Sequence, residues 1–299
     1  ALDAATQDLY GSRIFSKEHK RMVTSGDLDT DKTYVYGMFG CRDGYVYRIR
    51  IPVTSEEYDN NQHSIHQVSQ KFNNPEHVAY VDYAEVILVA DGGVLYSLKL
   101  NILTKAVSVE KIEYKGGQIV ALAVRKGMTK RDKKKGEEVV DDRVANYAVI
   151  VADKKSTKVK IGKVNDTDKK FKFSFNPDID TGKEHIPSCL SWSKSHNANY
   201  LAIGTTKGSV LVYNNNKNAT TRVLSEITPS DNTSHVLCVD WEGLVYRPSS
   251  TKEAFLATGR RDGSVYVHGL SRRSSFRIIE PNDKGPVTAI AWSSKADSD

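Results

Sequence analysis

One stretch of this chain recurs with small changes, and it constrains the fold more than any other feature. The segment 204–213, GTTKGSVLVY, aligns with the segment 259–268, GRRDGSVYVH, at both glycines, the serine and both valines. Shorter copies begin at Gly40 and Asp91. In each copy a glycine, which tolerates positive φ, separates two runs of alternating apolar residues. Each copy therefore predicts a β-hairpin with a tight turn.

A second pattern precedes the hairpins. Short apolar stretches end in tryptophan at Cys189–Trp192, Cys238–Trp241 and Ala289–Trp292, and weaker copies lie at His77–Tyr80 and Ile119–Val124. Each reads as an inner strand, so the three tryptophans are expected to be largely buried. Turns recur about every 50 residues, near residues 44, 92, 155, 208 and 263. A period of this length indicates one structural unit of four strands, repeated along the chain.

This repeat resembles that of the WD40 β-propeller family over roughly Thr33 to Ser294. The resemblance implies an all-β, WD40-like β-propeller of four-stranded blades, seven-bladed when complete. An all-β sandwich built from the same hairpins is the alternative fold. Tyr213-Asn214 and His268-Gly269 stand where the family carries its Trp-Asp dipeptide. That departure implies that the buried Asp-His network of the family is missing here.

The repeat also predicts the organisation of the chain. Residues 1–30 form an N-terminal segment, either closing strands or part of a preceding blade, and residues 31–299 form blades. Five blades and the first strand of another, Pro286–Trp292, can be read, so the propeller is expected to be incomplete at its C-terminus and part of a longer protein. Residues 125–145 carry mixed charge without apolar periodicity and are expected to form a mobile loop inserted in a blade.

Composition restricts the compartment. No apolar run is long enough to cross a bilayer, and the first 20 residues mix charges throughout, so neither a membrane span nor a secretory leader is expected. The cysteines Cys41, Cys189 and Cys238 are odd in number and far apart, which suits a reducing compartment. We therefore expect a cytoplasmic protein, with a cytoskeletal or nuclear location as alternatives.

Basic residues gather in two places. Turns between second and third strands share one face of a propeller, and they carry a candidate basic rim: Arg42, Lys154, Lys155, Lys207, Arg260 and Arg261. Such a rim would dock an acidic protein or phosphate groups, and solvated turns without a partner are the alternative. The charged loop carries a candidate basic site for nucleic acid or nuclear import: Lys130, Arg131, Lys133, Lys134 and Lys135.

The sequence contains no recognisable catalytic motif. Residues 204–209 lack the spacing of a phosphate-binding loop, no Gly-x-Ser-x-Gly elbow occurs, and the pair His63 and His66 lacks further metal ligands. No cofactor, metal or enzymatic activity is expected. The alternative is an enzyme whose active-site residues are scattered over several loops.

The order of motifs from Ile186 to Trp292 is similar to that in the late blades of the actin-interacting protein 1 family. That resemblance implies actin and cofilin as protein partners, and a role in disassembling cofilin-decorated filaments. The same motifs are shared by scaffold subunits of trafficking, ciliary and nuclear complexes. A non-enzymatic platform for protein–protein interactions is the expectation common to all of these relatives.

Overall fold

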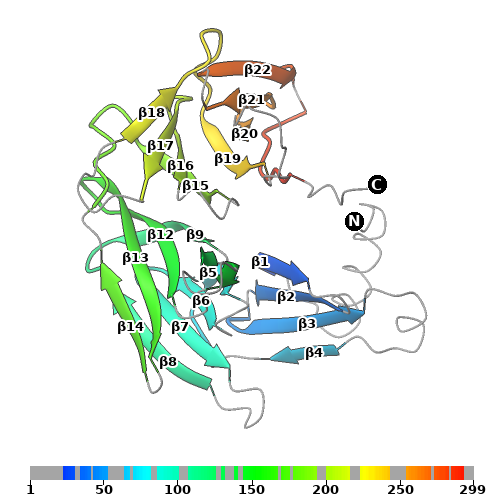
Figure 1. Ribbon diagram of the computed structural model, residues 1–299, viewed down its shortest axis with the longest axis vertical. Helices are drawn as coiled ribbons and strands as arrows, with labels where there is room; N and C mark the ends of the chain where they lie inside the picture. Colours follow the sequence, from blue (N-terminus) through cyan, green and yellow to red (C-terminus); the bar gives the residue numbers. More distant parts are fainter. Residues whose placement is uncertain are drawn as a thin grey trace. The chain divides into compact units, whose positions relative to one another are not determined.

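The computed structural model is all-β. It describes residues 23–30, 34–41, 43–52, 64–67, 70–81, 86–100, 107–125, 129–131, 138–140, 144–167, 170–175, 178–193, 200–215, 223–242, 254–270, 273–282 and 284–292. Within these ranges every regular element is a β-strand, and no helix is found (Figure 1). Accordingly, none of the described residues belongs to a helix long and apolar enough to span a membrane.

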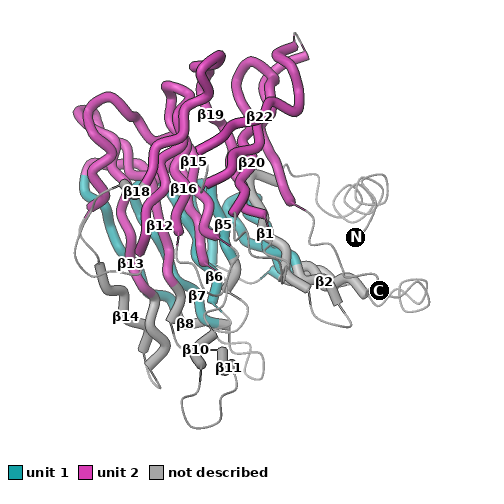
Figure 2. Tube along the Cα trace, turned by 45° about the horizontal axis from the view of Figure 1, so that its top comes forward, with its two compact units in different colours: residues 1–115 teal, residues 116–299 magenta. Residues whose placement is uncertain are grey.

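The first compact unit, residues 1–115, contains two four-stranded antiparallel sheets, blades 1 and 2 (Figure 2). Blade 1 consists of β1 (Val23–Thr30), β2 (Tyr34–Cys41), β3 (Val46–Pro52) and β4 (Ser64–Gln67). Blade 2 consists of β5 (Pro75–Val81), β6 (Val86–Asp91), β7 (Val94–Leu100) and β8 (Val107–Glu113). The first strands of the two blades, β1 and β5, are in contact.

The second unit, residues 116–299, contains blades 3, 4 and 5. Blade 3 consists of β9 (Gln118–Arg125), β12 (Val144–Ala152), β13 (Thr157–Thr167) and β14 (Lys170–Phe175). Blade 4 consists of β15 (Pro187–Trp192), β16 (Tyr200–Thr205), β17 (Val210–Asn214) and β18 (Val223–Ile227). Blade 5 consists of β19 (Val236–Trp241), β20 (Phe255–Arg260), β21 (Val265–Gly269) and β22 (Ser274–Ile279).

In all five sheets the strands lie in chain order, as the sequence repeat predicted. Within the second unit β15 contacts both β9 and β19, so successive blades meet through their first strands. Four of the five predicted turns hold a glycine at positive φ, namely Gly44, Gly92, Gly208 and Gly263. The fifth, Asp153–Ser156, has none, and the Asp153 carboxylate instead accepts hydrogen bonds of 2.7 Å from the amides of Lys155 and Ser156.

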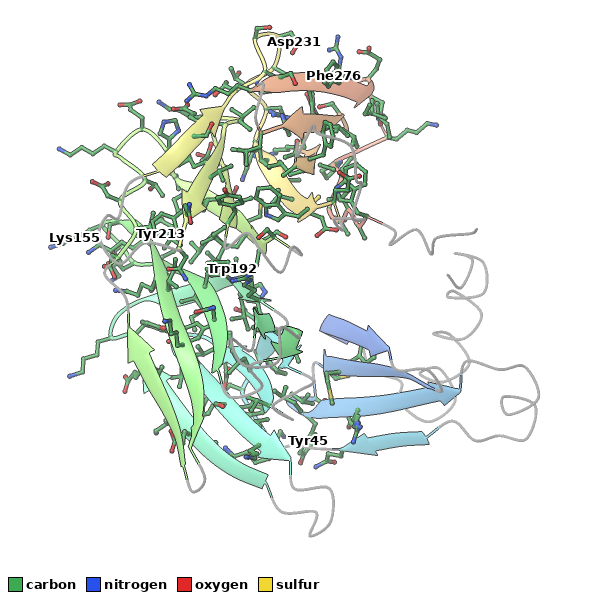
Figure 3. All side chains as sticks on the ribbon, in the orientation of Figure 1. Tyr45, Lys155, Trp192, Tyr213, Asp231 and Phe276 are labelled. Carbon is green, nitrogen blue, oxygen red and sulfur yellow. The ribbon has the colours of Figure 1, made fainter. Side chains whose placement is uncertain are left out.

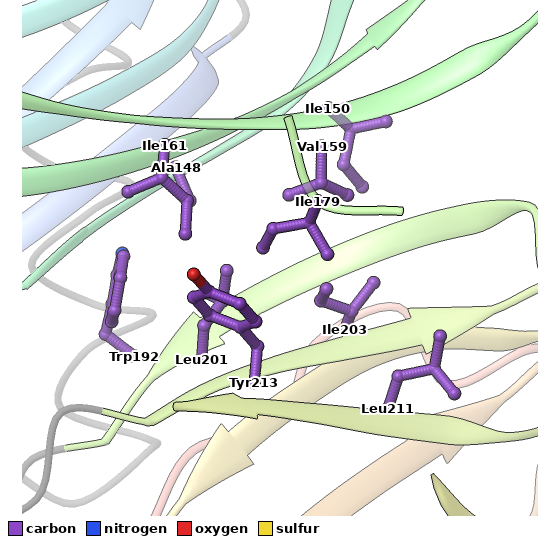
Figure 4. Packing of buried hydrophobic residues seen from close by; sticks show 10 residues of the cluster. All are labelled: Ala148, Ile150, Val159, Ile161, Ile179, Trp192, Leu201, Ile203, Leu211 and Tyr213. Carbon is purple, nitrogen blue, oxygen red and sulfur yellow. The ribbon is translucent and has the colours of Figure 1, made fainter. Parts of the chain in front are cut away.

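Apolar layers between neighbouring blades form the core of the second unit. Ala148 and Ile161 of blade 3 lie near Trp192 and Tyr213 of blade 4, and Ile150 belongs to the same buried cluster (Figure 4). A similar cluster joins blade 4 to blade 5, and Trp241 lies in it with 1% of its surface exposed. Burying side chains of this size stabilises a fold by roughly 2 kcal/mol each. The predicted burial of the first two tryptophans is therefore confirmed.

Three local expectations differ from the structure. Trp292 is only half-buried, and residues 286–292 run beside β19 without forming a regular strand. The first blade begins with β1, inside the segment 1–30 that the sequence kept apart. The insertion expected as a loop contains a short hairpin of β10 (Thr129–Arg131) and β11 (Glu138–Val140). Its charged sequence hides this pairing, because strand patterns are recognised by apolar alternation.

Candidate interaction surface

Strand order places two kinds of loop at the same end of each sheet. In four antiparallel strands, the turn between the second and third strands and the loop that leads to the next blade lie together. Hydrogen bonds confirm this in the second unit, where the Thr206 amide donates to Ile186 and the Arg261 amide donates to His235. We call this surface the turn face: turns 153–156, 206–209 and 261–264, and the loop residues 178–186, 228–235, 280–282 and 284–286.

Arg260, predicted as part of the exposed basic rim, is completely buried. Its guanidinium donates hydrogen bonds to the carbonyls of Gly208 at 2.8 Å and Ser234 at 2.9 Å, and it lies 4.7 Å from the centre of the Tyr266 ring. Burial lowers the pKa of Arg260. The side chain thus links the turn of blade 4 to blade 5, and the prediction that it belongs to the exposed basic rim was wrong. The strand pattern is consistent with this burial. Alternate residues of a strand point to the same side of the sheet, so Arg260 lies on the same side of β20 as Leu256, which is buried.

The exposed basic residues of the turn face form a different set. Lys155, labelled in Figure 3, is one of five exposed basic residues that form no ion pair within the described residues, the others being Lys154, Lys183, Arg261 and Lys284. Lys207 is exposed and paired with Glu184. Lys183 and Lys284 were missed because they lie in loops outside the repeated turns.

The carboxylates of this face are largely engaged within the protein. Hydrogen bonds from the amides of Lys155 and Ser156 lower the pKa of Asp153. Burial favours a raised pKa for Asp262, but hydrogen bonds from Ser264 and Asn232 outweigh it and lower the pKa. Asp178 lies 2.7 Å from the Lys160 ammonium. These acids are held by internal partners, so the basic side chains without ion pairs are the charged groups of this face that are free to contact a partner.

The remaining predicted site residues cannot be placed on a surface. Arg42, Lys133, Lys134 and Lys135 lie outside the described residues. Lys130 and Arg131 belong to β10, whose side chains are not described. A role for Arg42 in docking a partner stays a prediction, as does a role for the five loop residues in binding nucleic acid or in nuclear import.

Blade 5 contains a buried polar chain that the sequence did not indicate. The His268 ring lies 2.9 Å from the Thr258 hydroxyl and 2.8 Å from the Ser275 hydroxyl. It occupies the position at which the Trp-Asp dipeptide is absent. Burial, with a smaller contribution from the Arg260 charge, lowers the pKa of His268 to about 3. The ring is therefore neutral at physiological pH and serves as a hydrogen-bonding group of the core.

Acid is expected to destabilise the protein through His268. The unfolded chain takes up a proton near pH 6.5, whereas the folded chain takes it up only near pH 3. Between these values the unfolded state binds more protons, so the free energy of unfolding falls as pH falls, by up to about 1.4 kcal/mol per pH unit. Urea unfolding between pH 4.5 and 7 should show a shallower dependence for His268→Gln than for the wild type. An equal dependence of the free energy of unfolding on pH in the two proteins would contradict the lowered pKa of His268.

No arrangement typical of catalysis is found in the described part of the chain. There, no three side chains of His, Cys, Asp or Glu are grouped to hold a metal ion. The Cys189 thiol is buried, and this burial raises its pKa to about 12, so it is not a nucleophile at neutral pH.

Comparisons with known proteins identify the fold. No family model matches the sequence, and no curated protein matches it either. The structure is similar to Sqt1 of Saccharomyces cerevisiae, with 10% identity, a TM-score of 0.57 and 88% of this chain covered. It is also similar to Raptor of Chaetomium thermophilum, with 9% identity, a TM-score of 0.57 and 91% covered. The chain spans 63% of the first of these chains and 22% of the second. Both contain WD40 propellers, and this chain therefore has the fold of a WD40-like β-propeller.

Proposed function

We propose that this chain is a non-enzymatic scaffold that binds protein partners through the turn face of its second unit. The observation that carries the proposal is the charge arrangement of that face. Lys154, Lys155, Lys183 and Lys284 are exposed and form no ion pair among the described residues, while Asp153, Asp178 and Glu184 are held by amides or ion pairs. An acidic segment of a partner protein is the complementary ligand.

The fold supports this role. Similarity to Sqt1 and Raptor shows the architecture, and propellers of this type present loops on a rigid frame. In blades 4 and 5 the frame is reinforced by Arg260, which fixes two neighbouring turns relative to each other. A rigid surface lowers the entropic cost of ordering a binding site. We place this activity in the cytoplasm or nucleus, where its free thiols stay reduced.

Salt and charge reversal test the proposal. The tagged full-length protein is purified from its own cells at low and high salt, as wild type, as Lys155→Glu with Lys183→Glu, and as Lys111→Glu with Arg273→Glu. The last variant changes the net charge equally, at exposed residues of β8 and of the loop before β22. Partner recovery should fall at high salt and in the first variant only, because a surface electrostatic contact is screened by ions. Recovery that is insensitive to salt and to both variants would refute the proposal.

Actin and cofilin are the most specific partners that the sequence suggested. Neither structural comparison supports that assignment in particular. The same purification distinguishes a role in binding actin and cofilin from a role as a subunit of another complex. Recovery of actin together with cofilin supports a role in filament disassembly. Recovery of a stable multisubunit complex without them assigns the chain to a trafficking, ciliary or nuclear assembly.

A further inference from the structure

The turns of blades 3, 4 and 5 each carry a serine at the same position. In each turn the serine carbonyl accepts a hydrogen bond of 2.9 to 3.1 Å from the amide three or four residues earlier. The three serines are Ser156 of blade 3, Ser209 of blade 4 and Ser264 of blade 5. Only 3% of Ser209 and none of Ser264 is exposed, whereas Ser156 is half-buried. An enzyme that acts on the turn face can therefore reach Ser156 more readily than its two equivalents.

The hydroxyls of these serines are also held differently. Ser264 donates to Asp262 at 2.6 Å, and Ser209 shares a hydrogen bond of 2.8 Å with another hydroxyl. The Ser156 hydroxyl, in contrast, lies 3.3 and 3.4 Å from the two carboxylate oxygens of Asp153, which is the long limit for a hydrogen bond. Backbone amides fix the turn of blade 3 through hydrogen bonds of 2.7 Å. The Ser156 hydroxyl can thus react without removing the bonds that shape its turn.

Basic side chains lie on both sides of Ser156 in the sequence. Lys154 and Lys155 precede it, and both are exposed without an ion pair among the described residues. Lys158 follows it, also exposed, in a long ion pair of 4.0 Å with Asp178. Protein kinases select their substrates by such charge patterns, and acidic groups of the enzyme bind basic residues beside the acceptor. The turn therefore presents a weakly held hydroxyl in the setting that a kinase of this kind recognises.

We propose that Ser156 is a phosphorylation site for a protein kinase that recognises basic residues on both sides of its acceptor. ATP supplies the phosphoryl group. A bond forms between Ser156 Oγ and the γ-phosphorus, and the bond from that phosphorus to the β,γ-bridging oxygen breaks. ADP leaves with the electron pair of the broken bond, and the hydroxyl proton passes to a basic group of the kinase.

Phosphorylation reverses the charge of this turn. Residues 153–156 contain two lysines and one aspartate, so their net charge is +1. A phosphoserine adds about −1.5 to −2 at pH 7, which makes the turn negative. An acidic partner is then repelled where the unmodified lysines attract it. This regulatory consequence rests on the scaffold proposal, whereas the modification of Ser156 does not.

Phosphate incorporation tests the site. The purified chain, shown by circular dichroism to be folded, is incubated with Mg-ATP and the catalytic domain of protein kinase C, which selects serines flanked by basic residues. Mass spectrometry locates the phosphate, and we expect it on Ser156. Lys154→Ala with Lys155→Ala should slow incorporation there about tenfold, the effect of losing about 1.4 kcal/mol of kinase binding. A control that removes two exposed lysines of the first unit, Lys111→Ala with Lys115→Ala, should leave the rate unchanged.

Two results of this assay overturn the site. The first is the absence of phosphate from Ser156 in the folded chain, including the case in which Ser156 is modified only after heat denaturation. The second is an equal rate of incorporation in the two lysine variants, which shows that the basic residues of the turn are not recognised.

Partner recovery tests the regulation separately. Wild type and Ser156→Ala are both treated with the kinase, returned to an extract of the protein's own cells and purified at low salt. We expect Ser156→Ala to retain the partner and the phosphorylated wild type to lose it. Equal recovery overturns the regulation if Lys155→Glu with Lys183→Glu still reduces binding. If that lysine variant binds normally, the scaffold proposal fails and the regulation with it, while the site is judged by phosphate incorporation.

Discussion

Replacing Arg260 with alanine is expected to lower the free energy of unfolding by about 3 kcal/mol. The substitution leaves the carbonyls of Gly208 and Ser234, which now accept hydrogen bonds from a buried charge, without their donor. It also removes the stacking of the guanidinium on Tyr266. Urea unfolding followed by circular dichroism measures the change.

The neighbouring residue provides a matched control. Arg261 has the same side chain but is exposed. Replacing it with alanine is therefore expected to change the free energy of unfolding by less than about 0.5 kcal/mol. Similar losses of stability in the two alanine variants would mean that Arg260 does not form buried hydrogen bonds to Gly208 and Ser234. Arg260→Lys should fall between them, since one ammonium cannot reproduce the planar fork that reaches both carbonyls.

The Gly208→Ala substitution is expected to lower the free energy of unfolding by about 3 kcal/mol. Gly208 has a φ of +84°, where an L side chain is strained by roughly 1 to 2 kcal/mol. A Cβ there would also lie 2.7 Å from the backbone carbon of Thr233, and overpacking of this kind costs about 1 to 3 kcal/mol. Thermal unfolding of the purified variant measures the sum.

Gly182 separates these two contributions. Its φ is +76°, but no atom lies within 4 Å of the position that a Cβ would take. Gly182→Ala should therefore cost only the backbone strain, roughly 1 to 2 kcal/mol. An equal loss of thermal stability in Gly208→Ala and Gly182→Ala would disprove the close approach of the turn at Gly208 to the loop at Thr233.

The repeat predicted the blades because its signals are local. Glycine between alternating apolar runs identifies a turn, and tryptophan at the end of a short apolar stretch identifies a first strand. The turn at residues 153–156, which lacks glycine, also fits the predicted spacing of about 50 residues. Five sheets follow at the expected places.

The surface was predicted less well, because it depends on contacts between distant parts of the chain. Position in a turn suggested that Arg260 was exposed, but the turn of the preceding blade and the loop before β19 enclose its guanidinium. Lys183 became a candidate only when strand order placed its loop beside the turns. The missing Trp-Asp dipeptide implied that the Asp-His network is missing, but it did not predict the hydrogen bonds that His268 forms instead with Thr258 and Ser275.

The turn of blade 3 has a further consequence for how this surface can change. Its shape depends on the Asp153 carboxylate and the backbone, and none of residues 153–156 has a positive φ. Positions 154 and 155 are exposed and accept most side chains without backbone strain. Mutation can therefore alter the charge displayed there while the fold is unaffected, so partner choice can diverge at this turn faster than in blades 4 and 5, where the turns are tied together.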